Sequence, residues 1–295
     1  MTPIVVGTGL LKVLACFKSL LRMTLFKRFV DTFWRPLLAT AAWGGAAAAA
    51  LAAAAPTADN PAGIIWQPVA GFQIARTETT VAQFRRHMRA EDLVTQAERQ
   101  GGGEVFEAGW TKKPGWTWQA PFGRPAADDE PAVHITWPEA QAFCRWAGGR
   151  LPTDAQWLQA AYTEQRATPA APFVRSTRYD YPSGSSPRGA MCLGDCGAVA
   201  QTQAVPHGAV LMRGAGHALA TNGTPGVNGL LHMGGNAWEW VDEPPGAPAT
   251  PATLERRTRG GSWWYGSAPM RADHLQAKQP GTAVVYLGFR CVRTP

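Results

Sequence analysis

Five cysteines and six histidines are the side chains of this sequence best suited to nucleophilic or metal chemistry. Four of the cysteines lie beyond residue 140, at Cys144, Cys192, Cys196 and Cys291, and four cysteines can pair in three ways. The sequence has no HExxH zinc motif, no Walker-type phosphate loop and no GxSxG nucleophile elbow. A metal site built from dispersed histidines remains open, although a lone histidine is more often a hydrogen-bonded structural residue.

The composition of the 295-residue chain indicates a compact domain rich in loops and aromatic packing. It has 13 Trp, 32 Gly and 24 Pro, and only 17% of its residues are charged, which is typical neither of a long-helix bundle nor of a disordered chain. The first 58 residues hold six of the 28 basic residues and one of the 21 acidic ones, so the remainder carries a net charge of only +2. We therefore expect no nucleic-acid partner.

The N-terminal segment has the pattern of an export signal. Lys27, Arg28 and Arg35 precede an apolar, alanine-rich run over residues 36–55. Cleavage after Ala54 would satisfy the rule that small residues flank the cut. Uncleaved, the run is about long enough to anchor the chain, since a spanning helix needs roughly 20 residues.

Two domains follow from this pattern: an export signal or N-terminal anchor plus linker over residues 1–58, and one folded domain over residues 59–295. Met23 is an alternative start. The expected location is the bacterial periplasm, or the outer side of the inner membrane if the leader remains, and membrane contact is expected only through an uncleaved leader. In an oxidising compartment, disulfides are the expected state of the cysteines.

Three threonine capping boxes predict where helices begin. They are Thr80 with Gln83, Thr136 with Glu139, and Thr153 with Gln156. Residues 64–74 have the composition of a strand interrupted by Gly71. The Gly- and Pro-rich segments 101–129 and 167–229 predict irregular structure.

Several separated strings match one protein family in the same order. The early strings are TETT at 77–80, VTQAE at 94–98 and VFE at 105–107. The longest is PAVHITW at 131–137, which leads into AFCRWAGGRLPTDAQW at 142–157. The later ones are GNAWEW at 235–240, RGGSW at 259–263 and LGFRC at 287–291. On these strings, residues 64–293 resemble the formylglycine-generating enzyme (sulfatase-modifying factor) family.

The resemblance implies a single α+β domain with a C-type-lectin-like fold, rich in loops, with short strands and a few helices. It also implies a disulfide between Cys144 and Cys291, which stand where the family has a structural one. Cys192 and Cys196 match no position of the family. Their spacing favours a local disulfide over a zinc site, because no second Cys/His pair is spaced nearby.

The same resemblance identifies a departure in the active site. Enzymes of this family oxidise a substrate cysteine with dioxygen, using Cu(I) held by two thiolates, which are ligands suited to a soft ion. Those cysteines lie three and eight residues after the serine of the GGS motif, where this chain has Tyr265 and Met270 after Ser262. A thioether could still bind copper, but a neutral tyrosine is a poor Cu(I) ligand, so the family's cysteine–copper activity is not expected here.

Other pocket positions of the family are retained. Trp238 and Ser262 match residues that border its oxygen and substrate pocket, although a core tryptophan and a turn serine are equally simple interpretations. His274, four residues past Met270, is a further pocket candidate. The HxxxHxE pattern through which sulfoxide-forming relatives bind iron is absent from the sequence.

The family's calcium site is also altered. Gly235, Ala237 and Glu239 match its carbonyl and carboxylate ligands, but His232 stands where the family has Asn or Asp. Because Ca²⁺ takes oxygen ligands, the histidine weakens this calcium-type site, and His232 with Glu239 would better suit a transition metal. A surface histidine without an ion is the third interpretation. Calcium, copper and iron therefore all remain open as cofactors.

We predict an exported oxidoreductase, or a factor that matures a protein or metabolite, with an altered active site. Its partner would be an unidentified protein or small-molecule substrate in the exported compartment; relatives without the cysteine pair include proteins of periplasmic siderophore maturation. The alternative is a non-catalytic binding module on the same fold, because fold does not fix function. Formylglycine generation by an unrecognised route is the third hypothesis.

Overall fold

The computed structural model describes residues 54–197, 204–205, 213, 216–243 and 254–295. The chain divides into two units, Met1–Ala49 and Ala50–Pro295, and the helices and strands described belong to the second. Most of the predicted export signal lies outside the described residues. Within them, no helix combines the length and apolar character needed to cross a membrane.

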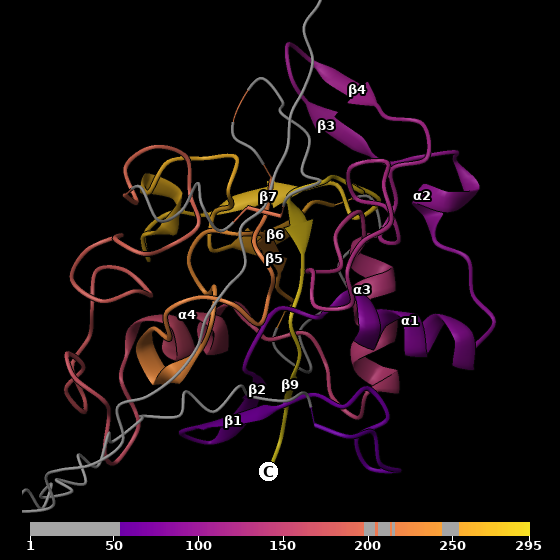
Figure 1. Cartoon of the computed structure of the whole chain (residues 1–295). Coiled ribbons are helices and arrows are strands. Elements are labelled where there is room, and N and C mark those ends of the chain that lie inside the picture. Colours follow the sequence, from indigo (N-terminus) through magenta and orange to yellow (C-terminus); the bar gives the residue numbers. More distant parts are fainter. Residues whose placement is uncertain (1–53, 198–203, 206–212, 214–215, 244–253) are drawn as a thin grey trace, which may run out of the picture. The chain divides into compact units, whose positions relative to one another are not determined.

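Four α-helices form in the first half of the folded unit (Figure 1): α1 (Val81–Ala90), α2 (Gln96–Arg99), α3 (Trp137–Trp146) and α4 (Asp154–Tyr162). All four begin with a capping box, in which two otherwise unpaired backbone N–H groups receive side-chain acceptors. The three predicted helix starts are confirmed, and α2, capped by Thr95 and Glu98, is an addition. Among the residues described after α4, two short 3₁₀ turns form, η1 (Val227–Gly229) and η2 (Ala268–Met270).

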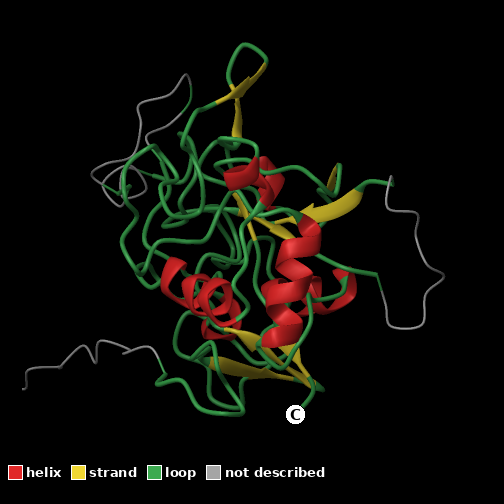
Figure 2. Cartoon of the chain, turned by 90° about the vertical axis from the view of Figure 1, so that its right-hand side faces the viewer, coloured by secondary structure: helices red, strands yellow, loops and turns green. Residues whose placement is uncertain are grey.

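In the part of the chain that the structure describes, nine short strands form two antiparallel sheets and one mixed sheet; the strands are yellow in Figure 2. The first contains β1 (Trp66–Val69), β2 (Phe72–Ala75) and β9 (Val292–Arg293) in that order, and the second is the hairpin of β3 (Glu104–Phe106) and β4 (Trp110–Lys112). The third has the order β7 (Gln276–Lys278), β6 (Arg256–Arg259), β5 (Trp238–Trp240) and β8 (Leu287–Gly288). β5 pairs with β8 in parallel, so the chain crosses over between them.

Two of the expected segments differ in the structure. The single interrupted strand is a hairpin, because Gly71 adopts φ +85° and turns the chain between β1 and β2. Residues 101–129 are not wholly irregular, since they contain the β3–β4 hairpin. Its Phe106 and Trp110 face each other across the turn with ring centroids 5.4 Å apart, which is the kind of cross-strand aromatic pair that stabilises a hairpin.

The core joins the helices to the last strands. Phe84 of α1 packs against Phe143 of α3 with ring centroids 5.7 Å apart, and both rings contact Phe289. A disulfide joins Cys144 on α3 to Cys291, with a Cα–Cα distance of 5.5 Å, and both residues are fully buried. A second disulfide joins Cys192 to Cys196. The chain is thus the loop-rich α+β domain with few helices and short strands that the sequence predicted.

Candidate functional site

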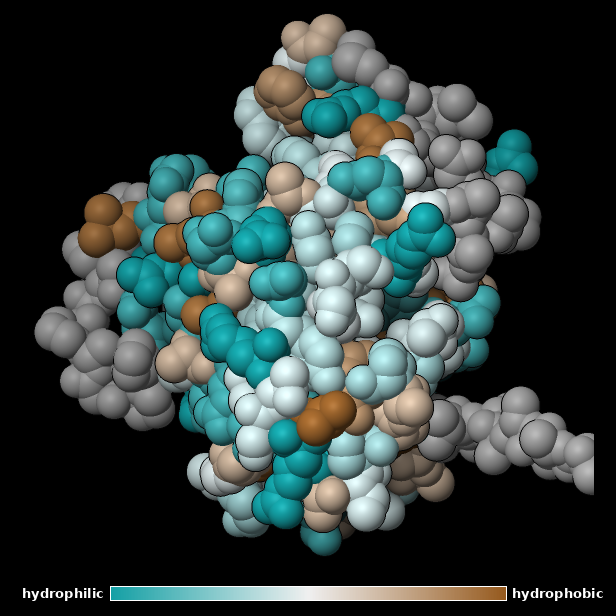
Figure 3. All heavy atoms as spheres, turned by 90° about the vertical axis from the view of Figure 1, so that its left-hand side faces the viewer, coloured by the Kyte–Doolittle hydropathy of each residue, from teal (hydrophilic) through white to brown (hydrophobic). Residues whose placement is uncertain are grey.

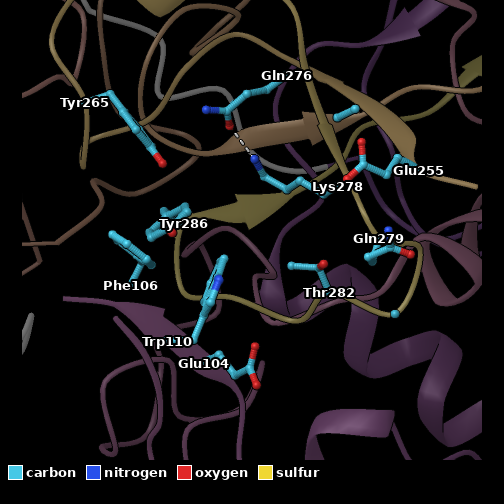
Figure 4. A pocket seen from close by; sticks show the side chains of 12 residues that line it. Glu104, Phe106, Trp110, Glu255, Tyr265, Gln276, Lys278, Gln279, Thr282 and Tyr286 are labelled. Carbon is cyan, nitrogen blue, oxygen red and sulfur yellow. Dashed lines mark hydrogen bonds between the residues drawn. The ribbon is translucent and has the colours of Figure 1, made fainter. Parts of the chain in front are cut away.

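A cavity of about 760 Å³ lies between the edge strand β7 and the β3–β4 hairpin (Figure 4). Its aromatic wall comes from Phe106 and Trp110 of the hairpin and from Tyr265 and Tyr286 of the C-terminal region. Lys278 of β7 contributes a cation. The cavity therefore combines flat apolar surfaces with a small number of polar groups, which is the usual composition of a ligand site.

Backbone pairing fixes the two sides of this cavity. Glu104 donates its N–H to the carbonyl of Ala283 (2.8 Å) and accepts from the N–H of Val285 (3.2 Å), which attaches the hairpin to the segment before β8. On the other side, Gln276 and Lys278 lie two residues apart on β7 and so project from the same face. Among the described residues, β7 pairs only with β6 and is therefore an edge strand of this sheet.

The two hairpin aromatics are unusually exposed for residues of their size. Trp110 is 57% exposed and Phe106 is 43% exposed, whereas Tyr286 opposite them is buried. The Tyr286 ring meets Tyr265 edge-on at 5.8 Å and 88°. Burial is the main cause that raises the pKa of Tyr286 above its usual value, so its hydroxyl remains protonated near neutral pH. The cavity thus has a fixed wall of tyrosines and an accessible wall of hydrophobic rings.

The amine of Lys278 is the most strongly perturbed cation of the cavity. Burial lowers its pKa to about 8, while the nearby Glu255 carboxylate acts in the opposite direction. The Nζ atom lies 4.9 Å from the centroid of the Trp238 ring and donates a hydrogen bond to Gln276 Oε1 (Figure 4). Near neutral pH this amine is mostly charged, and it loses its proton far more readily than an ordinary lysine. It can hold an anionic group or exchange a proton with a ligand.

Three of the predicted pocket residues lie in or next to this cavity, and of these only Tyr265 is part of its lining. Tyr265 lines the cavity, and fully buried Trp238 lies behind it with ring centroids 5.8 Å apart. His274 packs against Trp238 at 5.9 Å. Burial, followed by the charge of Arg259, lowers the pKa of His274, so it is neutral at pH 7. Within the described part of the chain, His274 Nε2 and Trp238 Nε1 are buried without a hydrogen-bond partner.

The other two predicted pocket residues, Ser262 and Met270, do not line this cavity. The Ser262 hydroxyl accepts the N–H of Trp264 (3.3 Å), as expected of a turn serine. Met270 is fully buried, its carbonyl accepts a hydrogen bond from Tyr162 Oη (2.6 Å), and its Sδ lies 3.8 Å from Cys196 Sγ. The position that matches the family's second cysteine is therefore a core position in this protein.

The residues that match the family's calcium site form hydrogen bonds with other parts of the protein. Both carboxylate oxygens of Glu239 accept hydrogen bonds from Arg290, and Trp157 Nε1 donates a further one at 2.8 Å. His232 Nε2 contacts the carbonyl of Asn222, and burial lowers the pKa of His232 to about 4. Gly235 and Ala237 remain beside Glu239, but its carboxylate is engaged in an ion pair. The geometry thus gives no support to Glu239 and His232 as joint metal ligands.

One group of potential metal-ligating side chains is found in the residues described, formed by Cys192, Asp195 and Cys196, whose ligand atoms lie within 4.8 Å of one another. The two cysteines are joined as a disulfide. Asp195 accepts hydrogen bonds from the backbone N–H of Ser267 (2.9 Å) and from its hydroxyl (2.5 Å). This loop therefore packs onto the segment just after Tyr265.

Sequence reasoning missed Lys278, Phe106, Trp110 and Tyr286. The available signal was the pattern VFEAGW over residues 105–110, in which two aromatic residues flank a glycine at hairpin spacing. Nothing in the sequence near Lys278 distinguishes it from a surface lysine. Its burial depends on Trp238, which is 40 positions earlier in the numbering.

Together, the fold and the cavity define a C-type-lectin-like α+β domain whose candidate site lies beside its C-terminal sheet. Comparison with known proteins agrees: the sulfatase-modifying factor enzyme 1-like domain matches residues 44–295, and the chain belongs to this family.

Two sequence relatives and one solved structure show what this chain is similar to. The formylglycine-generating enzyme of Mycobacterium tuberculosis is 30% identical over 286 residues, covering 77% of this chain and 89% of the relative. The mouse protein named inactive C-alpha-formylglycine-generating enzyme 2 is 26% identical over 253 residues, covering 76% and 75%. The solved structure of PvdO from Pseudomonas aeruginosa matches at 15% identity with a TM-score of 0.47, covering 76% of this chain and 80% of that one.

The donor set does not fit the copper site that the family implies. Tyr265 offers a phenol at the first thiolate position, and Met270 at the second is buried away from the cavity. Two thiolates are the ligands that a soft Cu(I) ion needs there. The side chains at these two positions therefore do not support copper chemistry there.

Proposed function

We propose that this protein is an exported oxidoreductase, or a factor that matures a protein or metabolite, and that its substrate binds in the cavity between β7 and the β3–β4 hairpin. The observation that carries the proposal is the position of Tyr265. This residue stands where the family has its first active-site cysteine, and its side chain lines a cavity of about 760 Å³. A substrate site at the family's position is thus retained although the cysteine is not.

The side chains of the cavity favour one kind of ligand. Trp110 and Phe106 offer exposed ring faces that would contact an aromatic or otherwise flat group. The Lys278 amine would pair with a carboxylate or a similar anion, and desolvation beside Trp238 makes that pairing stronger than in water. With its lowered pKa, the same amine could take a proton from a bound substrate. Tyr265 and Tyr286 would orient the ligand and exclude water.

A ligand screen followed by a turnover assay tests this proposal. Ligand-detected NMR would be used with aromatic carboxylates and with extended peptides that end in a carboxylate. We expect binders whose affinity falls at least tenfold in Trp110→Ala and in Lys278→Met. Val174→Ala, which removes an exposed hydrophobic side chain outside the cavity lining, is the matched control. Absence of any binder that responds to both cavity variants would contradict the proposed site.

Turnover separates the two functions that share this site. Oxygen consumption, with a mass change of the bound ligand that is lost in the cavity variants, would establish the oxidoreductase. A non-catalytic binding module is the second candidate, favoured by the lack of any cysteine or methionine among the described residues that line the cavity. Tight binding without any change in ligand mass under oxygen, in metal-supplemented protein, would establish that alternative.

Export is a separate part of the proposal. Its support is the leader pattern of residues 1–58 together with two disulfides in the folded unit. Fractionation of a Gram-negative host that expresses the full chain, followed by N-terminal sequencing, tests it. We expect a periplasmic protein that begins at Ala55. A protein found in the cytoplasmic fraction with its first residues intact would overturn this part alone.

A further inference from the structure

Lys278 of β7 presents its amine to the cavity of about 760 Å³. Within the described part of the chain this amine forms no ion pair. Its Nζ donates a hydrogen bond to the uncharged Gln276 Oε1 (Figure 4) and lies 4.9 Å from the centroid of the Trp238 ring. We propose that Lys278 Nζ attacks the carbonyl carbon of an aldehyde or ketone bound in this cavity and forms an imine with it.

The surroundings of the amine favour its neutral, nucleophilic form, as in other lysines activated by desolvation. Burial lowers the pKa of Lys278 to about 8, and the Glu255 carboxylate, which also lines the cavity, opposes this effect only in part. At pH 7.5 about a quarter of this amine is therefore neutral, against roughly one part in a thousand for a lysine that titrates near 10.4. His274, whose charge would also act on Lys278, is neutral at this pH because burial lowers its pKa.

The hydrogen bond to Gln276 orients the amine without occupying its lone pair. Gln276 and Lys278 are two residues apart on β7, so their side chains project from the same face of the strand. A neutral amine has two N–H groups and one lone pair, and Gln276 accepts one of the N–H groups. The protonated imine carries its positive charge on the same nitrogen beside the Trp238 ring, where a cation–π interaction stabilises it.

The reaction balances without an oxidant or a reductant. The Nζ lone pair forms a C–N bond while the carbonyl π electrons move onto oxygen, and transfer of one proton from nitrogen to oxygen gives a carbinolamine. Protonation of its hydroxyl lets water leave with both electrons of the C–O bond, and the nitrogen lone pair forms the C=N bond. Loss of one proton then gives the imine, so amine and carbonyl compound yield imine and water. Tyr286 lines the cavity, and because burial raises its pKa, its hydroxyl stays protonated and can donate to the leaving oxygen.

The cavity lining indicates which carbonyl compounds fit. Phe106 and Trp110 offer exposed ring faces to a flat aromatic group. The charged fraction of Lys278 attracts a carboxylate. An aromatic 2-oxo acid combines these features, because its ketone is adjacent to its carboxylate and both groups reach the same amine. Imine formation uses no oxygen, so it rests on the proposed substrate cavity and not on the oxidoreductase assignment.

Reductive trapping in the full-length protein tests the imine. The protein is incubated without oxygen at pH 7.5 with phenylglyoxylate and sodium cyanoborohydride, which reduces an imine to a stable secondary amine, and peptide mass spectrometry measures the adduct at each lysine. Lys112 of β4 is the internal control: its amine also donates to a glutamine amide oxygen, Gln100 Oε1 (3.4 Å), but it is exposed and lies outside the cavity lining. We expect at least tenfold more adduct at Lys278 than at Lys112, with saturation as phenylglyoxylate increases. Equal modification of the two lysines would overturn the proposal without any variant having to fold.

Variants and a competitor separate this reaction from the proposed site. Lys278→Arg should abolish the saturable adduct, Trp110→Ala should reduce it at least tenfold, and Lys112→Arg should leave it unchanged. Mandelate has a hydroxyl in place of the ketone and cannot form an imine, so it should bind in ligand-detected NMR and protect Lys278. Mandelate binding without an adduct at Lys278 would overturn the imine and leave the proposed site intact. Absence of both binding and adduct would overturn the two together.

Discussion

Arg290 and Glu239 form a fully buried ion pair, with Arg290 Nη2 2.6 Å from Glu239 Oε1 and both side chains 0% exposed. The same guanidinium donates hydrogen bonds to the carbonyls of Ala75 (3.1 Å) and Leu231 (2.8 Å). Trp157 Nε1 donates a further hydrogen bond to the Glu239 carboxylate. One arginine thus connects the end of β2, the loop before β5, and β5 itself. The strings GNAWEW and LGFRC meet at this pair.

Removing the cation from this pair should destabilise the domain strongly. Arg290→Met leaves Glu239 charged or forces it to protonate, and it leaves several carbonyls without a donor. Loss of one partner from a buried pair costs about 3–5 kcal/mol, measurable as a lower midpoint in urea unfolding. Arg85→Met breaks a partly exposed pair with Asp128, whose side chain is 68% exposed, and should cost less than about 1 kcal/mol. Equal losses in the two variants would contradict this account.

Glu78 should make the stability of the domain depend on pH. Burial, together with the charge of Glu239, raises the pKa of Glu78 to about 8, whereas an unfolded glutamate titrates near 4.5. Between these values the folded protein holds a proton that the unfolded chain releases, so rising pH favours unfolding. The stability that protonated Glu78 contributes is fully present below pH 4.5 and is lost as the pH rises towards 8.

Glu78→Gln isolates this effect because glutamine does not titrate. The unfolding free energy of the wild type minus that of Glu78→Gln should decrease from pH 4.5 to 8, by up to about 1.4 kcal/mol per pH unit. The buried histidines His134 and His232, whose pKa values are lowered to about 4, are present in both proteins. Their pH-dependent contributions to the unfolding free energy therefore cancel in the difference. Denaturant titrations at four pH values measure it. A constant difference across this range would show that Glu78 titrates normally.

The N-cap of α4 should contribute measurably to stability. Thr153 Oγ1 accepts the N–H of Gln156 (3.2 Å), and Gln156 Oε1 accepts the N–H of Thr153 (3.2 Å). Thr153→Ala removes the first of these and should cost about 1 kcal/mol in urea unfolding. Ser185→Ala, at an exposed residue outside the helices, is the control and should change the unfolding free energy by less than about 0.5 kcal/mol. An unchanged midpoint in Thr153→Ala would contradict the capping role.

The helices could be predicted from the sequence, but much of the site could not. The capping boxes at Thr80, Thr136 and Thr153 involve residues only three positions apart. They can therefore be recognised in the sequence without knowing the fold. Glu239 forms its ion pair with Arg290, which lies 51 positions later in the sequence. A match to a sequence motif does not show which side chain pairs with a carboxylate.

The cavity was missed for a related reason. It requires the β3–β4 hairpin to be attached to the segment at Ala283, nearly 180 positions beyond Glu104 in the numbering. Periodicity within a short strand carries no information about such distant pairing. Conversely, Tyr265 was found because its spacing from Ser262 is local, although its role as a wall of the cavity with Lys278 became visible only in the structure.

Lys278 should titrate well below the other lysines. Burial against Trp238 lowers its pKa to about 8, whereas an exposed lysine titrates near 10.4. Reductive ¹³C-methylation followed by NMR would resolve each lysine, and Lys278→Arg identifies its signal by the loss of one resonance. We expect that resonance to titrate with a midpoint near 8. Binding of an anionic ligand should weaken as the pH rises through the same midpoint, because the neutral amine loses its attraction for the anion. In Lys278→Arg, which stays charged, binding should not follow that titration. A midpoint above 10 for the assigned resonance would show that the Lys278 amine is exposed to solvent, and would contradict its role in the site.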